Sequence, residues 1–328
     1  MRAREARATR APPREGVPVQ KRVVLATEKP FSAAARDQIL AILKEAGYDA
    51  VALEKYSGKG PLVEAAASAD ALIIRSDGID AEVLAAAGKL ALVVRAGAGY
   101  DNVDIKTAKE RGVAVMNTPG QNANAVAELV AAMMVMSARN FLDGTTGSEL
   151  KGKTLGLHAF GAVGRAVAGI AKGFGMNVIA FDPFVGADAM TALGVEPAAS
   201  VDALYEQARY VSLHIPATAE TRGSIGKDRL MRMPKGATLI NTARKEVINE
   251  AELLAVLEQR EDFRYVSDIA PSAETLAIMK EKYPTRVYLT PVKLGVQTGE
   301  ANVNAGLAAA RQIVAFFENG ERRFVVNP

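Results

Sequence analysis

The sequence predicts an α/β protein with two doubly wound parallel sheets, and three features of its 328 residues lead to that prediction. Short apolar runs of strand length alternate with longer segments in which apolar residues recur at helical spacing. Several apolar runs end in glycine or small polar residues, as strands do at the ligand-binding edge of a parallel sheet. Residues 153–183 combine a strand, a tight turn, a helix and a second strand closed by an acid, which is the outline of a dinucleotide-binding unit.

The dinucleotide-binding unit begins with an apolar run at residues 155–160 and turns through Ala159, Gly161 and Gly164. The two glycines let a pyrophosphate approach the backbone and the N-terminus of the following helix. Ala159 stands where the first glycine of such a turn usually lies, so the turn has less conformational freedom. Asp182 ends the second strand, where an acid binds the ribose hydroxyls and repels a 2′-phosphate. NAD is therefore favoured over NADP, and a glycine turn without a ligand is the alternative.

Composition narrows the class of protein. Nearly half of the residues are apolar and the chain is long enough for two domains, so a large buried core is expected. The absence of cysteine excludes disulfides and thiolate chemistry and favours a reducing, cytoplasmic location. Residues 1–20 hold five arginines and two glutamates, which we interpret as a disordered basic tail. The remaining charges balance and the longest apolar run, residues 129–136, is too short to span a bilayer, so we expect neither a nucleic-acid nor a membrane partner.

The first lobe is expected to alternate strands and helices. Strands are predicted at residues 23–27, 50–53, 71–74, 90–94 and 113–116, and helices at residues 32–47, 62–68 and from 100–104 onward. The third strand ends in Arg75 and Ser76, and the fourth is followed by residues 96–98, whose backbone N–H groups can bind an anion. Asn102 occupies the place of a third glycine there, so a second cofactor turn is not expected.

A polar break at residues 117–120 marks the first predicted domain boundary. Beyond it we predict a long alanine-rich helix at 122–139, strands at 210–214, 237–240 and 265–266, helices at 250–258 and 300–317, and a last strand at 324–326. The last helix and strand fall outside the cofactor-type repeat. We therefore expect an NAD-binding domain, residues 119–299, inserted into a substrate-binding domain of residues 21–118 and 300–328, with a cleft between them.

Five ordered motifs resemble the D-2-hydroxyacid dehydrogenase family, whose fold is Rossmann-like: RAGAGYDNVD from Arg95, NTPGQNANAVAEL from Asn117, AFGAVG from Ala159, LHIP from Leu213 and INTAR from Ile240. Among its branches, the segments TEKPF, NTPGQN, NTARKE and TPVKLG are similar to D-3-phosphoglycerate dehydrogenases of the short-chain type, which carry Lys in place of the family's catalytic His. The resemblance implies that the regulatory C-terminal domains of longer forms are absent from this chain.

The resemblance also implies the catalytic residues Arg244, Asp268 and Lys293. Arg244 would hold the substrate carboxylate and polarise the carbonyl, a task suited to the guanidinium fork. Counting back from Gly295 puts Lys293 at the position of the family's His. Asp268 matches the family's Asp that contacts the nicotinamide carboxamide, whereas Glu274 is displaced by one residue from the family's Glu. Which of the two carboxylates acts in catalysis is left open.

The site residues implied by the resemblance fall into two sets, and no metal is expected. The cofactor-binding set for NAD is Ala159, Gly161, Ala162, Val163, Gly164, Asp182, His214, Ile215, Pro216, Thr242, Ala243, Arg244, Asp268, Lys293 and Gly295. The substrate-binding set is Arg75, Ser76, Ala96, Gly97, Ala98 and Arg139. For Arg75 a salt-bridged structural role is the alternative. We expect His158 to be packed in a strand and His214 to lie beside the cofactor without exchanging protons.

The resemblance implies NAD-dependent oxidation of a phosphorylated 2-hydroxyacid, D-3-phosphoglycerate, to 3-phosphohydroxypyruvate, the first step of serine synthesis. The cofactor would supply the hydride chemistry and the protein the alignment. A glyoxylate or hydroxypyruvate reductase is the nearest alternative, and a corepressor-like binding protein that responds to NAD is an alternative of another class. The family is typically dimeric through its cofactor lobe, so we expect a homodimer in contact through the helix at 122–139.

Overall fold

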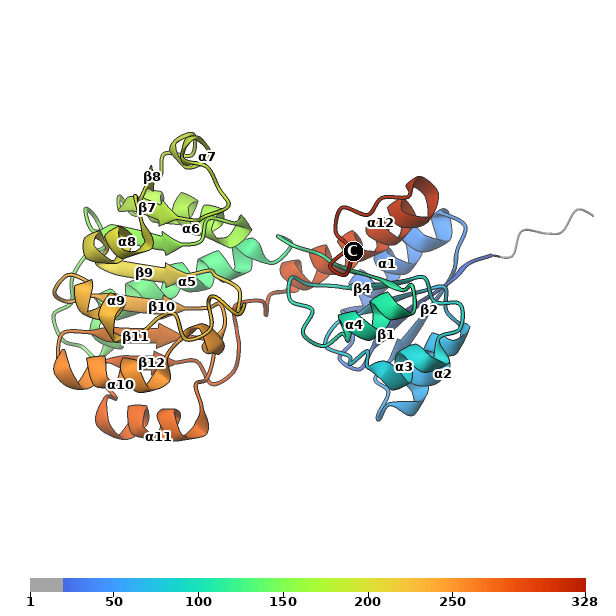
Figure 1. Ribbon diagram of the computed structural model, residues 1–328, viewed down its shortest axis with the longest axis horizontal. Helices are drawn as coiled ribbons and strands as arrows, with labels where there is room; N and C mark the ends of the chain where they lie inside the picture. Colours follow the sequence, from blue (N-terminus) through green and yellow to red (C-terminus); the bar gives the residue numbers. More distant parts are fainter. Residues whose placement is uncertain (1–19) are drawn as a thin grey trace, which may run out of the picture.

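The computed structural model describes residues 20–328, which form two lobes joined by two crossings of the chain (Figure 1). Each lobe is a parallel sheet with helices on both faces. The predicted fold class, two doubly wound parallel sheets, is confirmed. The basic tail predicted for residues 1–20 lies, apart from residue 20, outside the described part of the protein.

The sheet of the first lobe has five strands in the order β2-β1-β3-β4-β5. They are β1 (Arg22–Thr27), β2 (Asp49–Glu54), β3 (Ala71–Ile74), β4 (Leu92–Arg95) and β5 (Ala114–Asn117). Alternate residues of β1 enter different cores, because successive side chains of a strand point to opposite faces: Val23 and Leu25 pack on one side, Val24 on the other. Helices α1 (Ala33–Glu45) and α12 (Gly299–Asn319) cover the first face, and α2 (Gly60–Ser68), α3 (Ala81–Ala86) and α4 (Ile105–Glu110) cover the second.

The sheet of the second lobe has seven strands in the order β12-β11-β10-β9-β6-β7-β8. They are β6 (Thr154–His158), β7 (Asn177–Phe181), β8 (Glu196–Pro197), β9 (Tyr210–Leu213), β10 (Thr238–Asn241), β11 (Arg264–Ser267) and β12 (Val287–Leu289). One face carries α5 (Ala123–Ala138), α6 (Ala162–Gly173) and α7 (Ala187–Thr191); the other carries α8 (Val201–Gln207), α9 (Lys227–Arg232), α10 (Glu250–Gln259) and α11 (Ala273–Lys282). Two 3₁₀ turns, Asn140–Leu142 and Lys245–Val247, complete the lobe.

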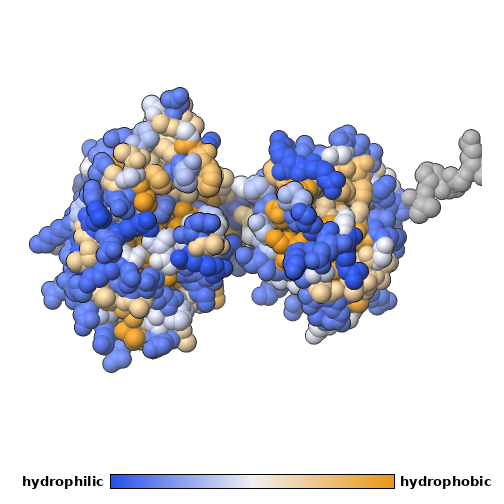
Figure 2. Space-filling view, viewed as in Figure 1, coloured by the Kyte–Doolittle hydropathy of each residue, from blue (hydrophilic) through white to orange (hydrophobic). Residues whose placement is uncertain are grey.

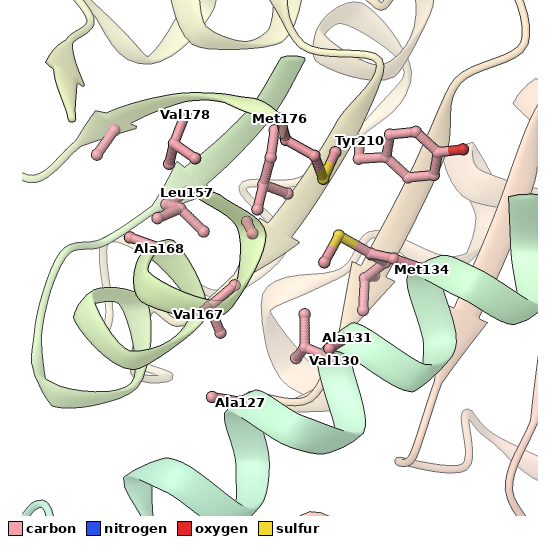
Figure 3. Packing of buried hydrophobic residues seen from close by; sticks show 14 of the residues in the cluster. Ala127, Val130, Ala131, Met134, Leu157, Val167, Ala168, Met176, Val178 and Tyr210 are labelled. Atoms are coloured by element: carbon pink, nitrogen blue, oxygen red, sulfur yellow. The ribbon is translucent and has the colours of Figure 1, made fainter. Parts of the chain in front are cut away.

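Helix α5 is buried along most of its circumference, since ten of its 16 residues are buried. Ala127 and Ala131 let it approach α6 closely, and the side chains of Val130 and Val167 fill the space between the two helices (Figure 3). This packing fixes the N-terminal end of α5 beside the cleft between the lobes, where Val126 is one of the lining residues.

The prediction of a last strand at residues 324–326 is wrong. The tail makes a single antiparallel bridge, Met116 with Val325, at the edge strand β5. The ladder stops there because a side chain replaces the backbone: the Asn327 amide accepts from the Val115 N–H at 2.8 Å and donates to the Val113 carbonyl at 2.9 Å. Strands β8 and β12 were not predicted, since each is only two or three residues long.

The outer surface is mixed in character. Figure 2 shows mostly hydrophilic residues on the surface of both lobes, with smaller hydrophobic patches scattered among them. Within residues 20–328, none of the helices combines the length and the apolar character that crossing a bilayer requires.

Candidate active site

The carboxyl ends of strands from both sheets meet at a cavity of ≈ 510 Å³ between the lobes. The first lobe contributes Arg75, directly after β3, and residues 95–99, at the end of β4 and just beyond it. The second lobe contributes residues 214–216 after β9, residues 242–244 after β10 and Asp268 after β11. Ligands of open α/β sheets bind at this edge, since helix N-termini and free backbone groups gather there. The arrangement identifies the cavity as the candidate active site.

The dinucleotide turn lies between β6 and α6. Ala159 has a φ of 85°, a conformation that costs a non-glycine residue free energy. A Cβ at Gly164 would lie 2.5 Å from the Ala159 carbonyl oxygen, so only glycine fits there. At Gly161, the N-cap of α6, a Cβ would meet open space, and no side chain caps the first N–H groups of the helix. These N–H groups and the open space fit a pyrophosphate.

Asp182 has a structural task that sequence reasoning did not assign to it. Its Oδ2 accepts a hydrogen bond from the Phe160 N–H and its Oδ1 accepts one from the Phe184 N–H, both at 2.8 Å. The carboxylate therefore holds the dinucleotide turn against the end of β7. Its contact with a ribose stays a prediction.

Three polar atoms in residues that line the cavity are buried without a hydrogen-bond partner among residues 20–328: Asp268 Oδ1, Thr242 Oγ1 and His214 Nε2. An unpartnered buried polar atom costs about 1–3 kcal/mol, so such a group is expected to meet a ligand. Asp268 is 1% exposed, and its other oxygen accepts the Gly295 N–H at 2.7 Å. Burial lowers the pKa of His214 to about 3, with a smaller effect of His158, so its ring is neutral. The carboxylate of Asp268, the hydroxyl of Thr242 and the neutral imidazole of His214 fit the amide donor and the carbonyl acceptor of a nicotinamide carboxamide.

Arg244 reaches across the interlobe cleft. Its Nη2 lies 3.4 Å from Asp101 Oδ2 in the first lobe, and its Nη1 donates to the Ala243 carbonyl at 2.8 Å. A Cβ at Gly99 would lie 2.7 Å from Arg244 Nη2, so the glycine makes room for the guanidinium. Because the Asp101 side chain is 85% exposed, this ion pair is weak and can yield to a substrate carboxylate.

Two further guanidinium groups line the cavity. Arg95 donates from Nε to the Arg75 carbonyl at 3.1 Å and folds over Gly97, where a Cβ would overlap it. Arg75 donates from Nη1 to the carbonyls of Lys29 and Pro30. Burial lowers the pKa of both arginines, and for Arg95 the neighbouring guanidinium of Arg75 lowers it further. Sequence reasoning missed Arg95, although its place at a strand end before two glycines was a usable signal.

Lys293 lies in the loop between β12 and α12 and lines the cavity. The side chain is open to the cleft, yet the protein atoms around its ammonium desolvate it. Desolvation lowers the pKa of Lys293 below its usual value, the charges of Arg244 and Arg95 lower it further, and Asp268 opposes them. The sequence left the sign of this shift open.

The structure separates several predicted site residues. Fourteen members of the two predicted sets line the cavity: Arg75, Ala96, Gly97, Ala98, Val163, His214, Ile215, Pro216, Thr242, Ala243, Arg244, Asp268, Lys293 and Gly295. Four more lie in or directly after the dinucleotide turn, Ala159, Gly161, Ala162 and Gly164, and Asp182 at the end of β7 accepts a hydrogen bond from that turn. Ser76 and Arg139 do not line it; Arg139 lies in a separate hollow at the other end of α5, beside Ser148 and Phe174.

His158 and Glu274 both lie outside the cavity. His158 is 8% exposed and its Nδ1 lies 3.2 Å from the Tyr205 hydroxyl, as expected for a packed strand residue. Burial is the main cause that lowers the pKa of His158 to about 4. Glu274 is an exposed residue in the first turn of α11 and does not line the cavity. Of the two carboxylates left open by the sequence, Asp268 is the one that lines the cavity together with Lys293 and Arg244.

Residues 121–291 match the family described as D-isomer specific 2-hydroxyacid dehydrogenase, NAD binding domain. The chain belongs to this family. The family is described by its NAD binding domain, and the chain is accordingly an NAD-dependent dehydrogenase.

Similar proteins have related activities. A solved structure of 3-phosphoglycerate dehydrogenase from Entamoeba histolytica, bound to NAD⁺, is 42% identical with a TM-score of 0.85 and covers 94% of this chain and 99% of its own. D-3-Phosphoglycerate dehydrogenase of Methanocaldococcus jannaschii is 33% identical over 82% of this chain, which spans 54% of that relative's length. Hydroxypyruvate reductase of Thermotoga maritima is 34% identical over 78% of this chain and 87% of its own.

Proposed function

We propose that this 2-hydroxyacid dehydrogenase oxidises D-3-phosphoglycerate to 3-phosphohydroxypyruvate with NAD, the first step of serine synthesis. The observation that carries the proposal is the gathering of Arg75, Arg95 and Arg244 around one cavity. Within residues 20–328, the single ion pair among the three arginines is the one between Arg244 and the exposed Asp101.

The charge of the cavity suits a substrate with two anionic groups. A lone carboxylate, as in glyoxylate, would engage one guanidinium and leave the charges of the others uncompensated. In phosphoglycerate the carboxylate can lie against Arg244 while the phosphate lies toward Arg75 and Arg95. Charge-assisted hydrogen bonds of this kind are about twice as strong as neutral ones, so the second anionic group adds both affinity and orientation.

The protein's own residues divide the chemistry among them. Arg244 holds the carboxylate and polarises the oxygen that is becoming a carbonyl. Lys293 takes the hydroxyl proton, which requires a neutral amine, and the desolvation that lowers its pKa makes that form accessible. Asp268 orients the nicotinamide end and opposes the shift of Lys293. The chemistry that NAD would supply when bound is hydride acceptance, and the residues of the cavity would align the substrate carbon for it.

A hydroxypyruvate or glyoxylate reductase is the second possibility, supported by relatives with those names in Thermotoga maritima and Korarchaeum cryptofilum. The two activities differ in whether the phosphate contributes to transition-state binding. The solved structure with a TM-score of 0.85, described as a 3-phosphoglycerate dehydrogenase, favours the phosphorylated substrate.

A homodimer and a cytoplasmic location belong to the same proposal. Apolar side chains are exposed near the C-terminal end of α5, where Val135 and Phe174 line a hollow and Leu142 is 69% exposed. Burial of these side chains against a second copy would favour association. Light scattering after size exclusion gives the mass directly, and a monomer at micromolar concentration would refute the dimer.

The experiment that tests the substrate compares D-3-phosphoglycerate with D-glycerate for the wild type, Arg75→Ala and the control Arg111→Ala, a change of an exposed arginine in the same lobe. We expect the wild type to prefer the phosphorylated substrate. Loss of Arg75 should lower kcat/KM for it by about 30-fold, which corresponds to about 2 kcal/mol, and change the value for D-glycerate much less. Equal rates of the wild type with both substrates would refute the proposal.

A further inference from the structure

Asn302, which no motif singled out, lies beside the cavity in the first turn of α12. Its Oδ1 accepts a hydrogen bond from Arg75 Nη2 at 2.6 Å, and its Nδ2 donates to the Thr298 carbonyl at 2.9 Å. The two bonds fix which end of the amide faces the arginine, because only the oxygen accepts and only the nitrogen donates. The side chain therefore presents a neutral acceptor to the guanidinium.

All the partners of the Arg75 guanidinium are neutral. Besides Asn302 they are the carbonyls of Lys29 and Pro30, each at 3.0 Å, and the ring of Phe31, whose centroid lies 4.9 Å from Arg75 Cζ. The nearby carboxylate of Asp77 accepts from the Arg75 backbone N–H rather than from its side chain. Within residues 20–328 the guanidinium thus has a fixed orientation and no carboxylate in direct contact, the combination that an anionic ligand requires.

The position of Asn302 along the sequence connects this arginine with the loop of Lys293. Asn302 lies nine positions after Lys293, and the loop that begins after β12 leads from the second lobe into α12 of the first. The loop is attached to that lobe where the Gly295 N–H donates to Asp268 at 2.7 Å, and to the first lobe where Asn302 accepts from Arg75. Asn302 is thus the point at which the anion-binding arginine contacts the segment that carries the proton acceptor.

We propose that Asn302 is a specificity-determining positioning residue: it orients Arg75 for the second anionic group of the substrate without neutralising it. The inference rests on the proposed function and deepens it. A carboxylate of the same shape at this position would pair with Arg75 and compete with the substrate's phosphate. An amide holds the arginine equally well and leaves its charge for the ligand.

The test is the ratio of kcat/KM for D-3-phosphoglycerate to that for D-glycerate, measured for Asn302→Asp and for Asn304→Asp. Asn304 is exposed two residues further along α12, so its change adds the same charge to the same helix away from the cavity. We expect Asn302→Asp to lower the ratio by about 10- to 100-fold through KM, on the scale of one charge-assisted contact. The control should keep the ratio within about threefold of the wild type, as is usual for surface substitutions.

Two further variants separate orientation from a general structural role. Asn302→Leu removes the acceptor without adding charge and should lower the ratio less than Asn302→Asp does. In an Arg75→Ala background, Asn302→Asp should have almost no further effect, because coupled residues are not additive. An unchanged ratio in Asn302→Asp, or an undiminished effect without Arg75, overturns the inference and leaves the proposed function standing. A wild type with no preference for the phosphorylated substrate overturns both.

Discussion

Replacing Lys293 with Ala tests the proton transfer, because the structure gives this residue a lowered pKa and a place beside Arg244 and Asp268. A positioned general acid or base contributes about two to four decades of rate, which is about 2.7–5.5 kcal/mol of transition-state stabilisation. We expect Lys293→Ala to lose that much kcat while its affinity for NADH changes little.

The pH dependence of the oxidation has a definite sign. Oxidation needs the neutral amine, so the rate should rise with pH through the pKa of Lys293. Desolvation and the charge of Arg244 lower that pKa, so the rise should come at lower pH than for an ordinary lysine at about 10.4. Lys293→His should restore part of the activity and move the rise toward about pH 6.5.

Stability provides an independent check on Lys293. The pKa of Lys293 is lower in the folded than in the unfolded protein, so the unfolded state binds the proton more tightly. At neutral pH this difference lowers the free energy of unfolding. This cost is relieved as pH rises from the folded pKa toward the unfolded one. Lys293→Ala should therefore keep or slightly raise Tm at pH 7 while it loses catalysis.

The assay is the NADH absorbance at 340 nm across a pH series, with NADH affinity measured by fluorescence and Tm by calorimetry. Lys282→Ala, an exposed lysine in the last turn of α11, is the control and should match the wild type in all three measurements. A Lys293→Ala enzyme with near-normal kcat and an unchanged pH profile would refute the role of proton acceptor. A fall in Tm of several degrees would mean that the residue supports the fold instead.

Three further predictions concern the cofactor lobe. Asp182→Ala should raise KM for NAD by more than about tenfold and shift preference toward NADP, because the ribose loses its partner and the N–H groups of Phe160 and Phe184 lose their acceptor. Steady-state KM values for both cofactors test this prediction. Unchanged values would remove Asp182 from the cofactor site. Ala159→Gly should leave Tm equal or higher, since relief of the positive φ, about 1–2 kcal/mol, offsets the greater freedom of the unfolded state; a clear drop in Tm contradicts the strain. Burial lowers the pKa of His158 to about 4, so the stability that depends on its neutral ring is lost as pH falls from about 6.5 toward that value. In thermal unfolding, the Tm of His158→Gln should therefore fall less between pH 7 and 5 than the Tm of the wild type. An equal fall in Tm would mean that another group causes the pH dependence.

The dinucleotide turn and the gathering of Arg244, Asp268 and Lys293 at one cavity could be predicted because their information is local and ordered. Gly161 and Gly164 lie at the start of α6, and Asp182 follows after that helix and strand β7, a spacing that follows from the geometry of the unit itself. Arg244 and Lys293 follow motifs that occur in the family's order. The sequence could not give the sign of the Lys293 shift, since it depends on distances between loops after three different strands.

Arg139 lies outside the cavity for a geometric reason. The N-terminal end of α5 lines the cavity, and Arg139 is the residue that caps its C-terminal end. At 1.5 Å per residue, the 16 residues of the helix separate the two ends by about 24 Å. A basic residue next to a motif-bearing helix can thus lie far from the site. Arg95 was missed for the opposite reason: its side chain folds back over Gly97, a contact that a pattern of letters does not reveal.

Two of the arginines that we propose to bind the substrate, Arg244 and Arg95, also lower the pKa of the proposed proton acceptor Lys293. Without a ligand, desolvation and the like charges of Arg244 and Arg95 lower the pKa of Lys293, so the neutral amine that oxidation requires forms more easily than in an ordinary lysine. A substrate with two anionic groups neutralises those arginines, and the pKa of Lys293 then rises, which increases its affinity for the hydroxyl proton. Binding and proton transfer therefore support each other. A substrate with one anionic group would leave part of the arginine charge uncompensated and Lys293 a weaker base, so the second charge contributes to the chemical step as well as to binding.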